Sequence, residues 1–401
     1  MTVVAIICEY NPFHYGHKYQ IDKIREQFGE DTAIIAIMSG NYTQRGELAV
    51  MSKKERSACA VLCGVNLVLE LPFPYSASSA EFFASAGVHI ANSLGIVDYI
   101  SFGSESGDIS QLISAARVFM TDEYKIKLAE LDADKTLGYP KKCEMAFRSL
   151  CEGELITFTP NNLLAIEYIK ALAKLKCSIK PHTVKRNGAD YDESNLLNHQ
   201  NQSAMAIRGM MSGSILPALD YVPEQTRQII KESFDNGSMP TDLQRLSFAI
   251  ISHFRLNPPT QSDKFHDADD GLYNRLYNAS FKANDIPTLL ELTETKKFTN
   301  ARIKRAMWNS FLGVTSSDVK ELPQYTQLLA MDKIGMLLLR NAKCQEGFSI
   351  LTKPSDFEHF SSKKKRQKTL SDSADSIFEL SKPKPGFGNS ALTFTPYIKN
   401  S

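Results

Sequence analysis

The sequence predicts an α/β fold, in which an open parallel sheet carries helices on both faces and a mainly α-helical region follows. Short apolar runs alternate with segments of helical spacing through residues 1–217. From residue 218 to about residue 351 the spacing is helical, and prolines separate some of the segments. We therefore expect two domains, residues 1–217 and residues 218–401, the second mainly helical.

The totals indicate a soluble protein of a reducing compartment. The chain has 401 residues, of which 43% are hydrophobic and 23% charged, as is ordinary for a globular protein. Its net charge is +1, so any surface for nucleic acid must be a local patch. The seven cysteines show no paired metal spacing and suit the cytosol. We see no signal peptide and no apolar stretch near the roughly 20 residues that span a membrane, so we expect a cytoplasmic protein without a membrane partner.

The first predicted strand and helix meet at a pair of histidines. An apolar run over residues 3–8 predicts a buried strand, and Asn11-Pro12 ends it. Apolar residues at helical spacing then predict a helix. His14 and His17 therefore lie where a strand gives way to a helix, which is where an open parallel sheet binds its ligand.

The residue types at this junction suit a phosphate. The start of a helix offers unpaired N–H groups and the positive end of the helix dipole. His14 and His17 share one face and could donate hydrogen bonds to charge that builds on a reacting phosphate. Gly16 would let a nucleotide approach the backbone. A surface pair or a helix cap is the alternative. A zinc pair is disfavoured because no Cys, Asp or Glu follows at ligand spacing, and we expect no metal held by the protein.

The other elements of the first region follow in order. Apolar runs predict strands at residues 32–38, 65–71, 98–102 and 178–185, the last of them closing the sheet. Helices are predicted from the cap at Ser52 to residue 62, over residues 76–92 and over residues 121–153. If the strands are parallel, the loops that follow them meet at the same edge as the histidines.

Polar loops at these strand ends carry candidate ligands. The loop over residues 39–46 is either a simple connector or a substrate loop. The turn over residues 103–108 begins at Gly103, which would face the crevice, although most glycine turns are only turns. Asn161 opens a helix after a proline and is either a cap or a ligand. Arg186 follows the strand at residues 178–185 and could pair with phosphate.

A basic segment stands within the helical region. Its cations include Lys296, Lys297, Arg302 and Arg305. Phe298 and Trp308 lie nearby, and charge together with aromatic rings suits RNA through phosphate contact and base stacking. The solvated basic face of an amphipathic helix is the alternative. A second basic run, over residues 363–368, is expected in an exposed loop.

Several short motifs occur in a set order along the chain. They are Glu9-Tyr10-Asn11-Pro12-Phe13-His14, Met38-Ser39-Gly40, Gln44-Arg45-Gly46-Glu47, Glu70-Leu71-Pro72, Phe102-Gly103-Ser104-Glu105, Pro160-Asn161-Asn162 and a turn from Ser203 to Arg208. As a set they resemble the bacterial tRNA(Met) cytidine acetate ligases, a family of the HIGH-type nucleotidyltransferase superfamily. The resemblance is close through about residue 215 and looser beyond it.

The resemblance implies a Rossmann-like sheet of the HUP type and a two-step reaction. ATP and acetate would give acetyl-adenylate and pyrophosphate, and the acetyl group would pass to N4 of the wobble cytidine of elongator tRNA(Met). His14 and His17 would be catalytic, and Mg²⁺ would arrive with the nucleotide. The implied ATP contacts are Ile7, Cys8, Glu9, Tyr10, Asn11, Pro12, Phe13, His14, Tyr15, Gly16, His17, Lys18, Tyr19, Gln20, Gly103, Asn161 and Arg186.

The turn at residues 203–208 resembles the second motif of the superfamily, which contacts the triphosphate. Ser203 and Arg208 are therefore expected at ATP, although Ser203 also suits a helix cap and Arg208 a surface position. Met205 departs from the family pattern, which has Thr at this position. Two other functions stay open. One is transfer of a nucleotide to a small phosphorylated metabolite, and the other is non-catalytic binding of tRNA.

Overall fold

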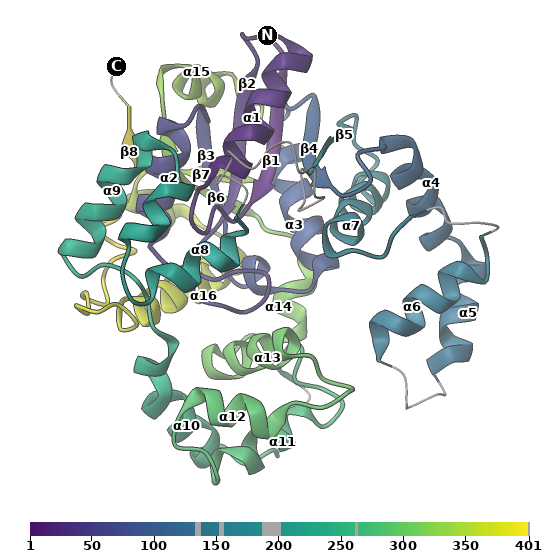
Figure 1. The fold of residues 1–401 in the computed structure, drawn as a ribbon, viewed down its shortest axis with the longest axis vertical. Helices are drawn as coiled ribbons and strands as arrows, with labels where there is room; N and C mark the ends of the chain where they lie inside the picture. Colours follow the sequence, from purple (N-terminus) through teal and green to yellow (C-terminus); the bar gives the residue numbers. More distant parts are fainter. Residues whose placement is uncertain (133–137, 152–155, 187–201, 261–263, 400–401) are drawn as a thin grey trace.

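A single mainly parallel sheet runs through the protein (Figure 1). The computed structural model describes residues 1–132, 138–151, 156–186, 202–260 and 264–399. The strand order is β5-β4-β1-β2-β3-β6-β7, and β8 pairs with β6. The strands are β1 (Val3–Cys8), β2 (Ala33–Ser39), β3 (Leu67–Leu71), β4 (Tyr99–Ser104), β5 (Lys180–Lys185), β6 (Tyr325–Met331), β7 (Ser349–Leu351) and β8 (Tyr397–Ile398). The predicted α/β class is confirmed.

The strands β1 to β5 are parallel, so their carboxyl ends share one edge of the sheet. β1 pairs with β2 from Val3 opposite Ala33 to Cys8 opposite Met38. The chain continues from β1 to β2 and β3 on one side, and β4 and β5 lie on the other side of β1. The strand order therefore reverses between β1 and β4. An open α/β sheet binds its ligands at such a switch point.

Alternate residues of the strands face two separate cores, one on each side of the sheet. Val4 and Ile6 pack with Ile21 of α1 on one side, together with residues of α2. Ala5 and Ile7 face the other side, where α3, α4 and α7 cover them. The helices of this part are α1 (Tyr15–Phe28), α2 (Lys53–Leu62), α3 (Ala80–Ser93), α4 (Ile109–Phe119), α5 (Asp122–Asp132), α6 (Tyr139–Arg148), α7 (Pro160–Lys174) and α8 (Ala204–Met211), with a 3₁₀ turn η1 (Tyr75–Ala77).

The later helices build a further core. Phe254, Leu276, Leu289 and Trp308 bring α10, α11, α12 and α13 together below the sheet (Figure 1). The helices of this part are α9 (Glu224–Asp235), α10 (Ser247–Leu256), α11 (Leu272–Ser280), α12 (Ile286–Thr293), α13 (Asn300–Leu312), α14 (Ser316–Lys320), α15 (Lys333–Asn341) and α16 (Ser362–Glu379). The 3₁₀ turns are η3 (Leu216–Tyr221), η4 (Leu243–Leu246) and η6 (Pro354–His359).

Two expectations for the later part of the chain are wrong. The sheet does not close with the strand predicted at residues 178–185, and the region up to residue 351 is not helical throughout. β6 pairs antiparallel with β3, from Leu67 opposite Met331. β6 covers the edge of β3, which would otherwise leave a row of unpaired backbone groups. A domain boundary at 217/218 stays a prediction, and the sheet takes strands from both sides of it.

The basic run at residues 363–368 is not a loop, and that expectation is also wrong. It forms the start of α16, which Ser361 caps with its side chain. Lys363 is exposed and pairs with Glu321, whereas Lys368 is buried and pairs with Asp372. The helix gives the run two sides, so only part of it faces solvent.

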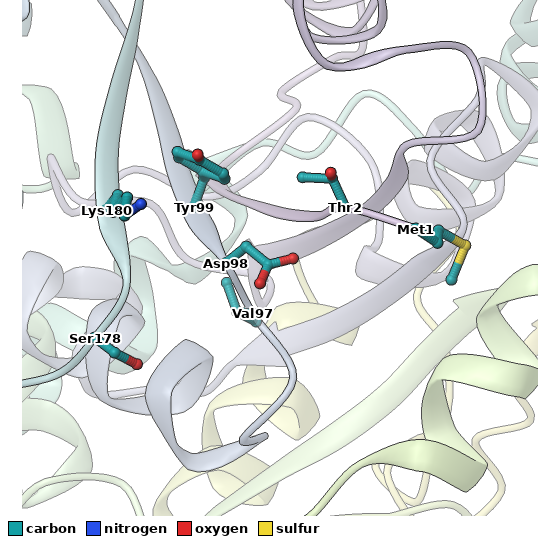
Figure 2. Close-up of a pocket in the computed structure, with 7 residues that line it drawn as sticks. All are labelled: Met1, Thr2, Val97, Asp98, Tyr99, Ser178 and Lys180. Atoms are coloured by element: carbon teal, nitrogen blue, oxygen red, sulfur yellow. The ribbon is translucent and has the colours of Figure 1, made fainter.

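The opposite edge of the sheet carries a shallow pocket of about 440 Å³ (Figure 2). Asp98, Tyr99 and Lys180 line it at the amino ends of β4 and β5, next to Thr2 before β1. The carboxylate of Asp98 accepts the backbone N–H of Val3 at 2.8 Å, which ties the strands together there. This pocket lies away from the carboxyl ends of the strands, where the residues of the candidate active site gather. In the described part of the chain, every helix is too short or too polar to cross a membrane.

Candidate active site

The predicted histidine junction lies at the carboxyl end of β1. α1 begins at Tyr15, and His14 is its N-cap residue, with the extended backbone that this position requires (φ −140°, ψ 174°). Nδ1 of His14 accepts the backbone N–H of Gly16 at 3.0 Å. Nδ1 of His17 accepts the backbone N–H of His14 at 3.2 Å. The helix cap and the candidate phosphate site are therefore built from the same two side chains.

These contacts set the tautomer of both rings. A neutral imidazole carries its proton on one nitrogen, and in each ring Nδ1 is used as an acceptor. The proton must then be on Nε2 in both His14 and His17. Each ring is left with one N–H donor that the helix does not use, and such donors suit the oxygens of a phosphate.

The histidines are neutral at pH 7. Burial, together with the positive charges of Arg186 and Arg208, lowers the pKa of His14 from its ordinary value of 6.5 to about 4. Burial likewise lowers the pKa of His17 well below its ordinary value, with help from His14 and Arg186. Neutral rings donate from Nε2–H without adding two buried charges to the site.

Gly16 is required by the histidine beside it. A Cβ atom at this position would lie 2.8 Å from Cε1 of His14 and 3.0 Å from its Nδ1. A residue with a Cβ atom would therefore force the His14 ring to shift from its capping position. The sequence suggested a close approach by a nucleotide, and the structure adds this reason from within the chain.

Gly103 and Arg186 lie against each other at the ends of β4 and β5. The backbone N–H of Arg186 donates to the carbonyl of Ser104 at 2.8 Å. A Cβ atom on Gly103 would lie 3.0 Å from Cγ of Arg186, so the glycine leaves room for the arginine stem. Arg186 is exposed, and its charge reaches both histidines. The rest of the loop predicted after β5, residues 187–192, lies outside the described residues.

Asn161 and Asn162 fasten the turn after β4 to the start of α7. Nδ2 of Asn161 donates to Oε1 of Glu105 at 2.6 Å. Oδ1 of the buried Asn162 accepts the backbone N–H groups of Glu105 and Ser106 at 3.0 and 3.2 Å. Although burial raises the pKa of Glu105, hydrogen bonds from Thr159 and Asn161 bring it below its ordinary value. The sequence did not predict a role in the site for Asn162 or Glu105. Their only indication was that each ends one of the motifs, Pro160-Asn161-Asn162 and Phe102-Gly103-Ser104-Glu105.

Arg208 reaches back to the loop after β1. It donates to the carbonyl of Asn11 at 2.9 Å and to Glu47 at 3.2 Å. Ser203 caps α8, because its hydroxyl accepts the backbone N–H of Ala206 at 3.2 Å. Met205 is exposed. The structure thus brings Arg208 to the histidines and gives Ser203 a capping role, while their predicted contacts with ATP stay predictions.

A fully buried arginine, which the sequence did not predict as a site residue, holds together the loops that follow β1 and β2. Arg56 of α2 donates to the carbonyls of Met51, Glu9, Ser39 and Gly40. Its guanidinium therefore joins the ends of β1 and β2 to the helix between β2 and β3. The sequence contains one indication of this role, because Arg56 directly precedes a run of small residues that suits a buried helix face.

The remaining residues of the span from 7 to 20 divide between core and crevice. Tyr10 and Phe13 are buried, and their rings contact the ring of His17 at centroid distances of 4.8 and 5.5 Å. They hold the histidine and offer the crevice only their backbone. Asn11 accepts the N–H of Val50 at 2.8 Å. The other expected contacts are Ile7 and Cys8 at the end of β1, and Tyr15, Lys18, Tyr19 and Gln20 on the first turns of α1.

The basic segment belongs to α13 and the loop before it, and most of its charge is paired. Arg302 contacts Asp269 at 2.6 Å, and Arg305 contacts Asp267 at 2.7 Å. Lys297 lies 3.5 Å from Asp270, and both side chains are about half exposed. Lys296 is exposed.

The expectation that aromatic rings of this segment stack on RNA bases is wrong. Phe298 and Trp308 are buried in the helical core. Nε1 of Trp308 donates to the carbonyl of Gly46 at 2.9 Å. The rings are core residues because α13 packs directly on the loop after β2.

Comparisons with known proteins identify the family and similar structures. Residues 1–389 match the family described as HIGH Nucleotidyl Transferase. A relative from Thermoanaerobacter, named tRNA(Met) cytidine acetate ligase, is 36% identical over 92% of this chain and 93% of its own. One of the same name from Acetivibrio thermocellus is 34% identical over 99% of both chains. The crystal structure of Thermotoga maritima TmcAL bound with alpha-thio ATP has a TM-score of 0.90 at 28% identity, and each chain is covered completely.

Proposed function

The chain belongs to the HIGH nucleotidyl transferase family, among relatives named tRNA(Met) cytidine acetate ligase, and we propose that it acetylates tRNA. In the first step ATP and acetate give acetyl-adenylate and pyrophosphate. In the second step the acetyl group passes to N4 of the wobble cytidine of elongator tRNA(Met), and AMP leaves. The products over one cycle are acetylated tRNA, AMP and pyrophosphate.

The observation that carries this proposal is the pair of neutral histidines at the switch point. His14 and His17 each keep one Nε2–H free of the helix. Their donors would face the oxygens of the α-phosphate, where negative charge grows as the acetate oxygen attacks. Arg186 and Arg208, whose charges reach His14, would hold the phosphates of the leaving pyrophosphate.

Mg²⁺ fits this site only as part of the nucleotide. Within the described ranges, no group of three His, Cys, Asp or Glu side chains is placed to hold a metal ion. Mg²⁺ prefers phosphate oxygens and water to such cages, and it would screen the charge of the triphosphate. Orientation of the acetate, exclusion of water and donation to the α-phosphate fall to the protein.

The second step needs an exposed cytidine and a held adenylate. The lone pair of N4 attacks the acetyl carbonyl, the bond to the adenylate oxygen breaks, and N4 loses one proton. An exocyclic amine is a weak nucleophile, so the adenylate must be held beside it away from water. A wobble base is already single-stranded and needs no strand opening.

The cations proposed to contact the tRNA are Lys296, Lys297, Arg302 and Arg305. Lys296 is exposed, whereas the other three lie beside aspartates.

The test follows labelled acetate into RNA. The protein is incubated with labelled acetate, ATP and bulk tRNA, and the tRNA is digested to nucleosides and separated by mass. Label on cytidine is expected, and it should disappear when the wobble cytidine of tRNA(Met) is replaced. Label on the 3′-terminal ribose would overturn the proposal in favour of a charging reaction. Transfer of adenylate to a small phosphorylated metabolite, with no label on RNA, would overturn it in favour of a metabolite transferase.

A further inference from the structure

A tight turn lies between the histidine site and α13. The backbone N–H of Gly46 donates to the carbonyl of Thr43 at 2.8 Å, and the N–H of Thr43 donates to the carbonyl of Glu47 at 2.9 Å. Gln44 and Arg45 are the two corner residues of this turn. The turn therefore presents Arg45 at its tip, where the side chain is exposed.

The turn is fixed on the side of the crevice and on the side of the helical core. The backbone N–H of Gln44 donates to the carboxylate of Glu9, at the end of β1, at 2.9 Å. The carbonyl of Gly46 accepts from Trp308 of α13 at 2.9 Å. Gly46 has φ 72°, and a Cβ atom there would lie 2.9 Å from the backbone nitrogen of Arg305. A turn held at both sides keeps its tip in one place.

Among the described residues, Arg45 differs from the other cations near this turn, because its side chain contacts no acidic or polar partner. Arg208 and Lys304 both contact Glu47, at 3.2 and 3.3 Å. Arg302 and Arg305 contact aspartates of the loop before α11. Within the described ranges, the Arg45 side chain makes no hydrogen bond or ion pair. In the described part of the chain, its guanidinium can therefore bind an anion without first losing a contact, unlike those of Arg208, Arg302 and Arg305.

We propose that Arg45 binds a phosphate of the RNA backbone next to the nucleotide that enters the crevice. The inference rests on the proposed tRNA function and names a contact for it outside the cations of α13. A guanidinium matches the paired oxygens of a phosphate. Because the neighbouring Gln44 touches Glu9, a strand held at Arg45 has its next base beside the end of β1. A rigid turn loses little freedom on binding, which favours a productive position of that base.

The experiment compares charge reversal at two exposed arginines in the full chain. R45E is the test variant. R340E is the matched control, because Arg340 is exposed on α15 and that helix follows β6 at the opposite edge of the sheet. Binding of elongator tRNA(Met) transcript is measured by filter retention at several KCl concentrations, and acetate-dependent exchange of pyrophosphate into ATP is measured without tRNA. Circular dichroism checks that each variant is folded.

R45E should bind tRNA about tenfold more weakly at low salt, and its slope of log affinity against log salt should fall by about one. Pyrophosphate exchange should stay at the wild-type rate, and R340E should match the wild type in both assays. Wild-type affinity and slope in folded R45E would overturn the inference. So would a loss of exchange in R45E, since Arg45 would then serve the nucleotide. A wild-type protein that neither binds nor acetylates tRNA would instead overturn the proposed function.

Discussion

The imidazole rings of His14 and His17 lie with their centroids 3.8 Å apart, and Nδ1 of His17 accepts the backbone N–H of His14 at 3.2 Å. A helix cap normally uses a short side chain such as Ser or Asp. Here the cap uses two rings that each retain a second nitrogen. The start of α1 is therefore organised so that the rings that satisfy the backbone also keep two Nε2–H donors that the helix does not use.

The capping role of His14 and its role as a hydrogen-bond donor can be separated by substitution. His14→Asn keeps an acceptor at the N-cap but removes the Nε2–H donor. We expect this variant to unfold near the wild-type temperature and to lose acetate-dependent pyrophosphate exchange by on the order of 10²-fold. His14→Ala should lose both the cap and the activity. Exchange at the wild-type rate in His14→Asn would show that the donor is not used in the reaction.

The depressed pKa values predict how stability depends on pH. Because burial lowers the pKa of His14 to about 4, the unfolded chain binds a proton below pH 6.5 that the folded chain does not. The contribution of neutral His14 is therefore fully present above pH 6.5 and is lost as the pH falls toward 4. We expect the Tm of the wild type to drop more steeply than that of His14→Asn between pH 7 and pH 4.5. Equal slopes in scanning calorimetry would contradict the assignment.

The parts predicted from the sequence depend on neighbours along the chain. The strand of residues 3–8, the break at Asn11-Pro12 and the start of α1 follow from local period and turn chemistry. The cap at Ser52 and the end of α2 at Leu62 are confirmed for the same reason. Placing the histidines at the switch point required only that the strands be parallel, and they are.

The parts that were missed depend on residues far apart in the chain. Arg56 reaches the carbonyl of Glu9 across 47 positions, and Asn162 reaches the N–H of Glu105 across 57. Trp308 was expected to help stack on RNA bases, but its indole N–H is satisfied by a backbone carbonyl 262 positions away. Periodicity shows that a side chain is apolar or charged, but it does not show which distant backbone group satisfies it.

Gly103 offers a test of the nucleotide position. In Gly103→Val the new Cβ would press on Cγ of Arg186 at 3.0 Å, and the branches would fill the space beside it. We expect the affinity for ATP to fall at least tenfold in calorimetric titration, because Arg186 would be displaced from the phosphates. Gly213→Val is the matched control, since among the described residues no heavy atom beyond its chain neighbours lies within 4 Å of a Cβ built there. Unchanged affinity in a folded Gly103→Val variant would mean that the turn does not face ATP.

The basic segment of α13 and the loop before it should contain two kinds of cation, those that contact RNA and those that stabilise the fold. The pair Lys296→Glu and Lys297→Glu should weaken tRNA binding without changing Tm, because both side chains are exposed. Arg305→Glu should lower stability by roughly 3 kcal/mol, because Arg305 and Asp267 are only 11% and 14% exposed and the variant opposes two negative charges. Filter binding and urea unfolding measure the two effects. A control pair of reversals at the exposed Lys125 and Lys127 of α5 should change neither quantity. If the lysine pair binds tRNA as the wild type does, the segment is structural and Arg45 alone remains as the proposed contact.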